Sequence, residues 1–153
     1  MIRLTLADAE ATARLGAALA TLVASHKGLV IHLLGELGAG KTTLARGLLR
    51  ALGVAGTIRS PTYTLLEPYE LPGHSLIHLD LYRLNDPNDL EQLGLRDYPA
   101  GQIAWLVEWP QRGSGHLPKP DVEAQLMHQG SLRLAQVESI YSDELQQACK
   151  MLL

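Results

Sequence analysis

A glycine-rich segment in the first third of the chain constrains the fold more than any other feature. It follows the pattern G-x-x-x-x-G-K-[ST], and with the next threonine it comprises Gly35, Glu36, Leu37, Gly38, Ala39, Gly40, Lys41, Thr42 and Thr43. Glycines allow backbone angles that turn successive N–H groups inward, where phosphate oxygens can accept from them. In this pattern the lysine reaches the β- and γ-phosphates of a nucleotide, and the threonine hydroxyl binds Mg²⁺. The segment therefore predicts a nucleotide phosphate site.

The flanking residues suit such a loop. Residues 29–34 are mostly apolar, as in a buried parallel strand. Residues 42–52 have apolar side chains at helical spacing, and Gly53 can end that helix. A strand, a glycine loop and a helix N-terminus in this order point the helix dipole at the phosphates. A chance match at a glycine-rich turn is the alternative, and this context disfavours it.

Two further apolar strands each end in a carboxylate. Residues 75–82 contain Asp80 after an apolar run, and residues 102–107 are followed by Glu108. Ligands of open α/β sheets bind at the carboxyl ends of the strands, so both acids are expected beside one Mg²⁺-nucleotide. Asp80 has the form of a Walker B acid. The alternative for each acid is that it only ends its strand in solvent and has no role in binding.

The segment 59–63 is a candidate switch. Pro61 restricts Ser60 to extended angles, which indicates a loop. Nucleoside triphosphatases often sense the γ-phosphate and Mg²⁺ through a threonine in this region, and Thr62 is placed for that role. An ordinary turn is an equally good interpretation of the same residues.

The remaining patterns predict an α/β, P-loop NTPase-like three-layer fold with a mixed sheet, parallel and antiparallel. A short link at 72–74 requires an antiparallel hairpin, and a second hairpin is expected around 129–131. The C-terminal part would close the sheet edge or cover the nucleotide. The expected strands are 3–6, 29–34, 63–71, 75–82, 102–107, 121–128 and 132–140, and the expected helices follow Asp8, Thr42, Asp86 and Ser142.

Composition limits the function classes. The 153 residues suit a single domain spanning 1–153. A net charge of −3 with only four lysines argues against a protein that binds nucleic acid mainly through its own surface. Cys149 is the single cysteine, so no internal disulfide is expected. No signal peptide pattern and no apolar run of about 20 residues occurs, which predicts a cytoplasmic protein without a membrane anchor.

Four motifs together resemble the TsaE (YjeE) family of bacterial ATPases needed to make threonylcarbamoyladenosine beside the tRNA anticodon. In chain order they are G-E-L-G-A-G-K-T-T, S-P-T-Y-T, H-L-D-L-Y-R and V-E-W-P. The resemblance extends from Ala11 to about Asp121. It implies that members hydrolyse ATP in complex with TsaB and TsaD and do not perform the transfer themselves. The tRNA would then be held only indirectly.

The resemblance also implies residue roles, with ATP and Mg²⁺ as cofactors. The loop would bind the ATP phosphates, and Lys41, Thr62 and Asp80 would serve hydrolysis. Thr42 and Glu108 would ligate Mg²⁺, while Asp80 would either bind the metal through water or activate the attacking water. Trp109 would lie near the nucleotide. Arg83, at the end of the H-L-D-L-Y-R motif, is a candidate arginine finger in cis, and Thr12 and Arg133, which lie outside the motifs, are candidates for the base pocket.

Two other function classes remain open at this point. A small-molecule or nucleotide kinase would need an arginine-rich lid to enclose an acceptor, and this chain has neither the length nor such a segment. A non-catalytic ATP-binding scaffold would have no need of two strand-end acids and a switch threonine.

Overall fold

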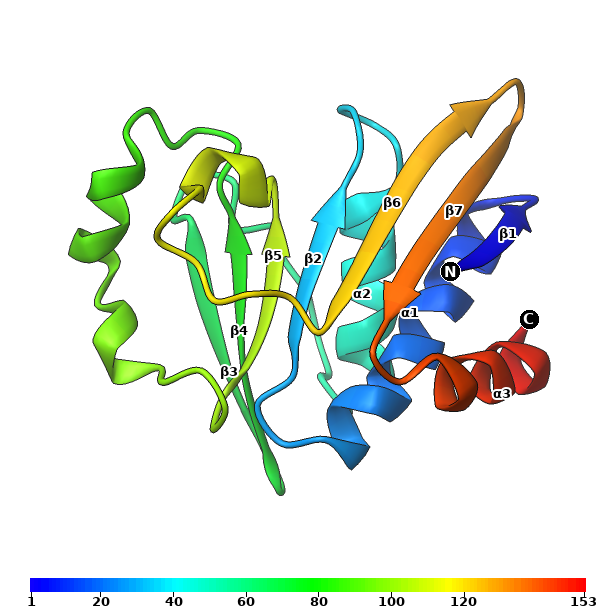
Figure 1. Cartoon of the computed structure of the whole chain (residues 1–153), viewed down its shortest axis with the longest axis horizontal. Helices are drawn as coiled ribbons and strands as arrows, with labels where there is room; N and C mark the ends of the chain where they lie inside the picture. Colours follow the sequence, from blue (N-terminus) through cyan, green and yellow to red (C-terminus); the bar gives the residue numbers. More distant parts are fainter.

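One seven-stranded mixed sheet forms the centre of the molecule, as the computed structural model of residues 1–153 shows (Figure 1). The strand order across the sheet is β1-β7-β6-β2-β5-β4-β3. The strands are β1 (Ile2–Leu6), β2 (Val30–Leu34), β3 (Leu66–Leu71), β4 (His74–Asp80), β5 (Ala104–Glu108), β6 (Val122–Gln129) and β7 (Leu132–Ser139). The helices are α1 (Ala9–Ser25), α2 (Lys41–Ala51) and α3 (Ser142–Leu152), with 3₁₀ turns η1 (Pro87–Leu93), η2 (Leu95–Asp97) and η3 (Pro110–Gly113).

Parallel pairing is confined to the middle of the sheet. Strands β4, β5, β2 and β6 run parallel, whereas β3, β7 and β1 pair antiparallel at the two sides. This confirms the predicted mixed sheet. The β3–β4 link is shorter than predicted, because His74 already pairs with Leu71 and only Pro72 and Gly73 form the turn. Strand β3 also begins later than predicted, since residues 62–64 form a turn.

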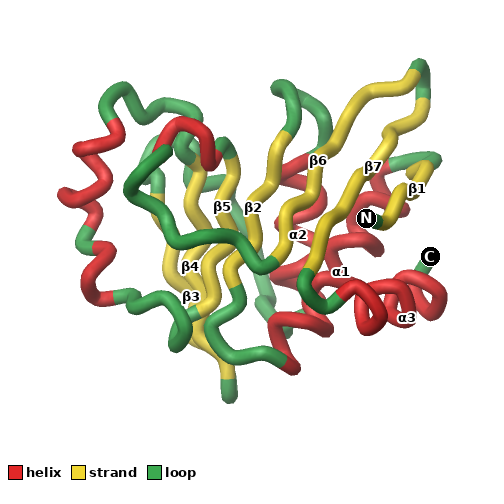
Figure 2. Tube along the Cα trace, viewed as in Figure 1, coloured by secondary structure: helices red, strands yellow, loops and turns green.

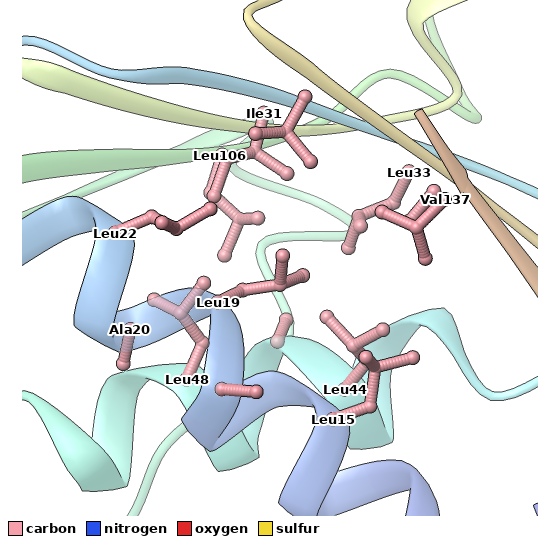
Figure 3. Packing of buried hydrophobic residues seen from close by; sticks show 14 of the residues in the cluster. Leu15, Leu19, Ala20, Leu22, Ile31, Leu33, Leu44, Leu48, Leu106 and Val137 are labelled. Carbon is pink, nitrogen blue, oxygen red and sulfur yellow. The ribbon is translucent and has the colours of Figure 1, made fainter. Parts of the chain in front are cut away.

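Side chains alternate between two apolar layers. Ile31 and Leu33 of β2 join the larger cluster beneath the helices, whereas Val30 joins the smaller cluster on the opposite face. Figure 3 shows Leu15 and Leu19 of α1 packed with the labelled side chains of α2 and the sheet. The η segments and their connections cover the other face, as Figure 2 shows in red and green. The three-layer prediction is therefore confirmed, with 3₁₀ turns in place of helices on that second face.

The short helix expected after Asp86 is confirmed, and it is of the 3₁₀ type: Asp86 caps it, and Gly94 ends it in the left-handed conformation. Helix α3 packs against α1 at the end of the sheet away from the glycine loop (Figure 1). Because of that position it does not cover a nucleotide. No helix has the length and apolar character needed to cross a membrane.

Candidate nucleotide-binding site

The carboxyl ends of β2, β4 and β5 meet at a hollow of about 240 Å³. The glycine loop follows β2, and the two predicted acids end β4 and β5. Parallel pairing brings these segments together, although about 70 residues separate the loop from the second acid along the chain. The hollow is lined by Leu37, Gly38, Gly40, Lys41, Thr42, Thr43, Thr62, Asp80, Tyr82, Glu108, Trp109 and Arg133.

The loop requires glycine where it enters α2. Gly40 has a φ of 113°, and a Cβ there would lie 3.3 Å from the Arg133 side chain. Gly40 provides no side-chain cap for α2, so no side chain of the capping residue occupies the first N–H groups of that helix. These groups and the helix dipole favour an anion at this point.

Lys41 is buried and is held by the loop itself. Its ammonium group donates to the carbonyls of Gly35 and Glu36, the second at 2.9 Å, and lies 4.5 Å from the centroid of a Trp109 ring. Burial lowers the pKa of Lys41, while the negative charges of Glu108, Asp80 and Glu36 act in the opposite direction. Lys41 is therefore a buried cation beside two acids.

The two carboxylates lie directly opposite each other in the β4–β5 pair. Thr42 Oγ1 donates to Glu108 Oε1 at 3.3 Å. Asp80 Oδ1 accepts from the Tyr82 backbone N–H at 3.1 Å, and Asp80 Oδ2 is 3.4 Å from the Thr62 hydroxyl. Burial raises the pKa of Asp80, and the neighbouring charge of Glu108 raises it further. The two acids thus have separate partners, one in the helix and one in the candidate switch.

The donor set fits Mg²⁺. The protein has no group of three His, Cys, Asp or Glu side chains placed to hold a metal by themselves. Mg²⁺ prefers oxygen ligands and is commonly bound by one or two carboxylates together with substrate phosphates and water. The Thr42 hydroxyl and the Glu108 carboxylate, next to the open end of α2, match that kind of site.

Trp109 has an unusual backbone conformation at the rim of the hollow. Its φ of 57° and ψ of 48° are left-handed, which is uncommon for a large side chain. The indole ring packs 5.0 Å from Tyr82, between centroids, and beside Lys41. This conformation directs the chain into η3 immediately after Glu108 and keeps the aromatic ring at the predicted nucleotide site.

The two base-pocket candidates have different positions. Arg133 reaches the hollow from β7, donates to the Gly38 carbonyl at 3.4 Å, and has a buried Nε without a partner. Thr12 is fully buried in α1, and its hydroxyl donates to the Asp8 carbonyl at 3.3 Å. Its methyl group would lie 3.4 Å from a Cβ at Gly40. Thr12 is not among the residues that line the hollow, and its hydroxyl faces its own helix, so its contribution to a base pocket stays a prediction.

Arg83 does not line the hollow either. Its guanidinium lies 4.4 Å from the Tyr63 ring centroid and donates to the Tyr63 hydroxyl at 3.5 Å. Tyr63 itself is 81% exposed. This pair braces the outer side of the candidate switch, and Arg83 does not point at the acids.

Sequence reasoning missed His78. Its Nε2 lies 2.7 Å from Glu108 Oε2, and both side chains are almost completely buried. The alternation of a strand places residues 78 and 80 on one face, so the signal was a histidine two positions before the predicted acid. Ser60 was also missed as a partner of Asp80, at 3.4 Å, and it lies 2.9 Å from the Thr62 hydroxyl.

Parallel β2, β5 and β4, a glycine loop leading into α2 and two strand-end acids define a P-loop NTPase-like α/β protein. A family model described as "Threonylcarbamoyl adenosine biosynthesis protein TsaE" matches residues 6–136, and the chain belongs to this family. The resemblance drawn from the four motifs is thereby confirmed. The match also extends past Asp121 and includes Arg133, so the predicted end of the resemblance was too early.

Individual relatives agree with the family assignment. The TsaE protein of Haemophilus influenzae is 48% identical over 98 residues, which is 64% of this chain and 62% of the relative. The Bacillus subtilis TsaE protein is 37% identical over 123 residues, or 80% of this chain and 73% of the relative. The match thus spans less than two thirds of the Haemophilus relative. The crystal structure of Bacillus subtilis YdiB has a TM-score of 0.71 with 27% identity, covering 99% of this chain and 93% of that one.

Proposed function

We propose that this protein is the Mg²⁺-dependent, ATP-hydrolysing component of the machinery that makes threonylcarbamoyladenosine in tRNA. The relatives carry the name "tRNA threonylcarbamoyladenosine biosynthesis protein TsaE", which supports the pathway. One geometric observation supports the chemistry most directly: Thr42 Oγ1 lies 3.3 Å from Glu108 Oε1 at the open N-terminus of α2, with Asp80 opposite Glu108. The function is carried out in the cytoplasm, with TsaB- and TsaD-like partners.

Each group has a specific task in this proposal. Thr42 and Glu108 would hold Mg²⁺, which neutralises phosphate charge when it is bound. Lys41 would exchange the carbonyls of Gly35 and Glu36 for phosphate oxygens. The first N–H groups of α2 would face the same phosphates.

Asp80 is the proposed acceptor for the attacking water's proton. Burial and the Glu108 charge raise its pKa, which makes the carboxylate a stronger base than an exposed aspartate. Its distance of 3.4 Å to the Thr62 hydroxyl links it to the switch loop. A change at the γ-phosphate would therefore reach the exposed Tyr63 region, where a partner could detect it.

The test measures ATP binding with and without Mg²⁺, and ADP release by the full chain alone and with TsaB and TsaD from the same organism. The wild type should bind ATP in a Mg²⁺-dependent manner, and ADP release should rise when the partners are added. Lys41→Ala should abolish both properties, because no other lysine reaches the hollow. Lys27→Ala, at an exposed lysine outside the hollow, is the matched control and should behave as wild type.

Three outcomes would contradict the proposal. Near-normal ATP hydrolysis by Lys41→Ala in the partner complex would show that the glycine loop is not the phosphate-binding site. Binding of ATP without any ADP release, even with partners present, would favour a scaffold. Transfer of the γ-phosphate to a small molecule in a product screen would favour a kinase.

A further inference from the structure

His78 forms a buried hydrogen bond with one of the two acids of the site. Its Nε2 and Glu108 Oε2 are 2.7 Å apart, and the side chains are 1% and 2% exposed. Because a carboxylate oxygen accepts, Nε2 carries the proton and donates. A bond of this kind between buried groups is shorter and stronger than one at the surface.

The strand register explains why this histidine reaches Glu108. In the β4–β5 pair Asp80 lies opposite Glu108, and His78 lies opposite Leu106. All three polar side chains therefore project from the face that α1 and α2 cover, as Leu106 does in Figure 3. His78 extends diagonally to Glu108 from two residues before Asp80.

The two oxygens of Glu108 have different partners. Oε2 accepts from His78, and Oε1 accepts from the Thr42 hydroxyl at 3.3 Å. A carboxylate held at both oxygens loses the freedom to rotate about its last side-chain bond. The hydrogen bond from His78 thus keeps Oε1 of Glu108, and not Oε2, on the side of Thr42.

A comparison with His32 shows that the bond to Glu108 is not a general consequence of burying a histidine in this sheet. It is also a buried histidine in the sheet, and like His78 it has one ring nitrogen without a partner. It pairs in register with Val107, on the opposite face from Glu108. Burial and an unpartnered nitrogen are therefore common to both histidines, and only the bond to Glu108 is particular to His78.

We infer that His78 is a positioning residue for the metal: it holds the Glu108 carboxylate with Oε1 toward Thr42, and in this way sets the affinity for Mg²⁺ in the nucleotide complex. The inference rests on the proposed Mg²⁺-ATP site. Partners that orient metal ligands typically contribute about 10- to 100-fold in metal affinity. His78 itself does not touch nucleotide or metal.

Three substitutions test the hydrogen bond separately from the side-chain volume. His78→Gln keeps a donor close to the position of Nε2, whereas His78→Leu fills similar space without a donor. His32→Leu is the matched control, since it makes the same change at a buried histidine on the other face. The measurements are the Mg²⁺ concentration for half-maximal ATP binding, ATP binding without Mg²⁺, and thermal unfolding of each variant.

His78→Leu should raise the half-maximal Mg²⁺ concentration about 10-fold or more and leave metal-free ATP binding within about twofold. His78→Gln should restore most of the Mg²⁺ affinity, and His32→Leu should match wild type. A folded His78→Leu protein with the wild-type Mg²⁺ requirement would overturn the inference while the proposed function stands. Wild-type binding that does not depend on Mg²⁺ would overturn the proposed function itself.

If His78→Leu does not fold, the comparison between His78→Gln and His78→Asn decides. The asparagine amide ends near the position of Nδ1 and is too short to reach Glu108. His78→Asn should therefore need about fivefold or more Mg²⁺ than His78→Gln. Equal Mg²⁺ requirements for these two variants would overturn the inference.

Discussion

Asp80 and Glu108 are paired across β4 and β5, yet their partners differ. Glu108 contacts Thr42 of the helix that begins at the glycine loop, whereas Asp80 contacts the Ser60 and Thr62 hydroxyls of the candidate switch. A direct metal ligand and a water-activating base give different mutant behaviour. The side-chain contacts thus predict separate roles for two residues of the same chemical type.

Glu108→Ala should weaken Mg²⁺-dependent ATP binding, because it removes the proposed carboxylate ligand. Asp80→Ala should leave binding near normal and reduce turnover about 10²- to 10⁴-fold, the usual effect of losing a general base. Titrations with and without Mg²⁺, combined with turnover rates in the partner complex, check both. The reversed pattern would mean that the two roles have been exchanged.

His32 provides a pH prediction. Burial lowers its pKa below 6.5, and its hydrogen bond to the Pro118 carbonyl opposes that shift. Below pH 6.5 the unfolded chain therefore binds a proton that the folded chain does not. Burying His32 in its neutral form therefore costs no folding free energy above pH 6.5, and the protein loses stability as the pH falls from 6.5 toward the pKa of His32 in the folded state.

His32→Leu should reduce the slope of unfolding free energy against pH between about pH 7.5 and about pH 5. Denaturant unfolding of wild type and variant at several pH values measures that slope. His128→Leu, at an exposed histidine, is the control and should keep the wild-type slope. An unchanged slope for His32→Leu would mean that His32 titrates alike in both states.

At the scale of elements, two glycines let α1 and α2 approach each other closely. A Cβ at Gly16 would lie 2.2 Å from the Leu44 carbonyl oxygen, and a Cβ at Gly47 would lie 2.2 Å from the Ala13 carbonyl oxygen. Both obstacles are backbone atoms, which cannot rotate away. The close crossing holds α2, and with it the loop that precedes Lys41, against the sheet.

Gly47→Ala should destabilise the protein by about 1–3 kcal/mol, because overpacking against backbone exceeds the gain in helix propensity. Denaturant unfolding measures the change. Arg46→Ala, the exposed neighbour on α2, should stay within about 0.5 kcal/mol of wild type. A Gly47→Ala protein as stable as wild type would show that the helices can separate without cost.

At the scale of the whole molecule, the candidate switch lies between the hollow and an exposed surface. Thr62 lines the hollow and contacts Asp80, while Tyr63, the next residue, is 81% exposed. A loop that orders around a γ-phosphate would present different surfaces with ATP and with ADP. Linkage then requires that a partner which prefers the ATP state also tightens ATP binding by the same factor.

We expect the TsaB–TsaD pair to bind preferentially in the ATP state, with a coupling of about 1–3 kcal/mol. Thr62→Ala should shrink that coupling more than it weakens ATP binding by the isolated chain. Partner affinity measured with a non-hydrolysable ATP analogue, with ADP and without nucleotide checks this. Equal affinity in the three states would leave the switch hypothesis without support.

The sequence by itself determined the features that depend on neighbouring residues. Local patterns of backbone freedom and side-chain periodicity predicted the glycine loop, the apolar runs that become β2 and β5, and the Asp86 cap. Asp80 and Glu108 were predictable for the same reason, since each follows an apolar run directly. Local patterns also sufficed for the mixed sheet, because a short link between two strands permits only antiparallel pairing.

Only the tertiary structure decided which distant residues meet. The register of β4 against β5 gives His78 its bond to Glu108, and the position of β7 brings Arg133 to Gly38. The hydroxyl of Thr12 turns to its own helix because α1 packs tightly beneath the loop. These outcomes depend on strand order and helix packing, which are set by the burial of the whole core and not by any short stretch of residues.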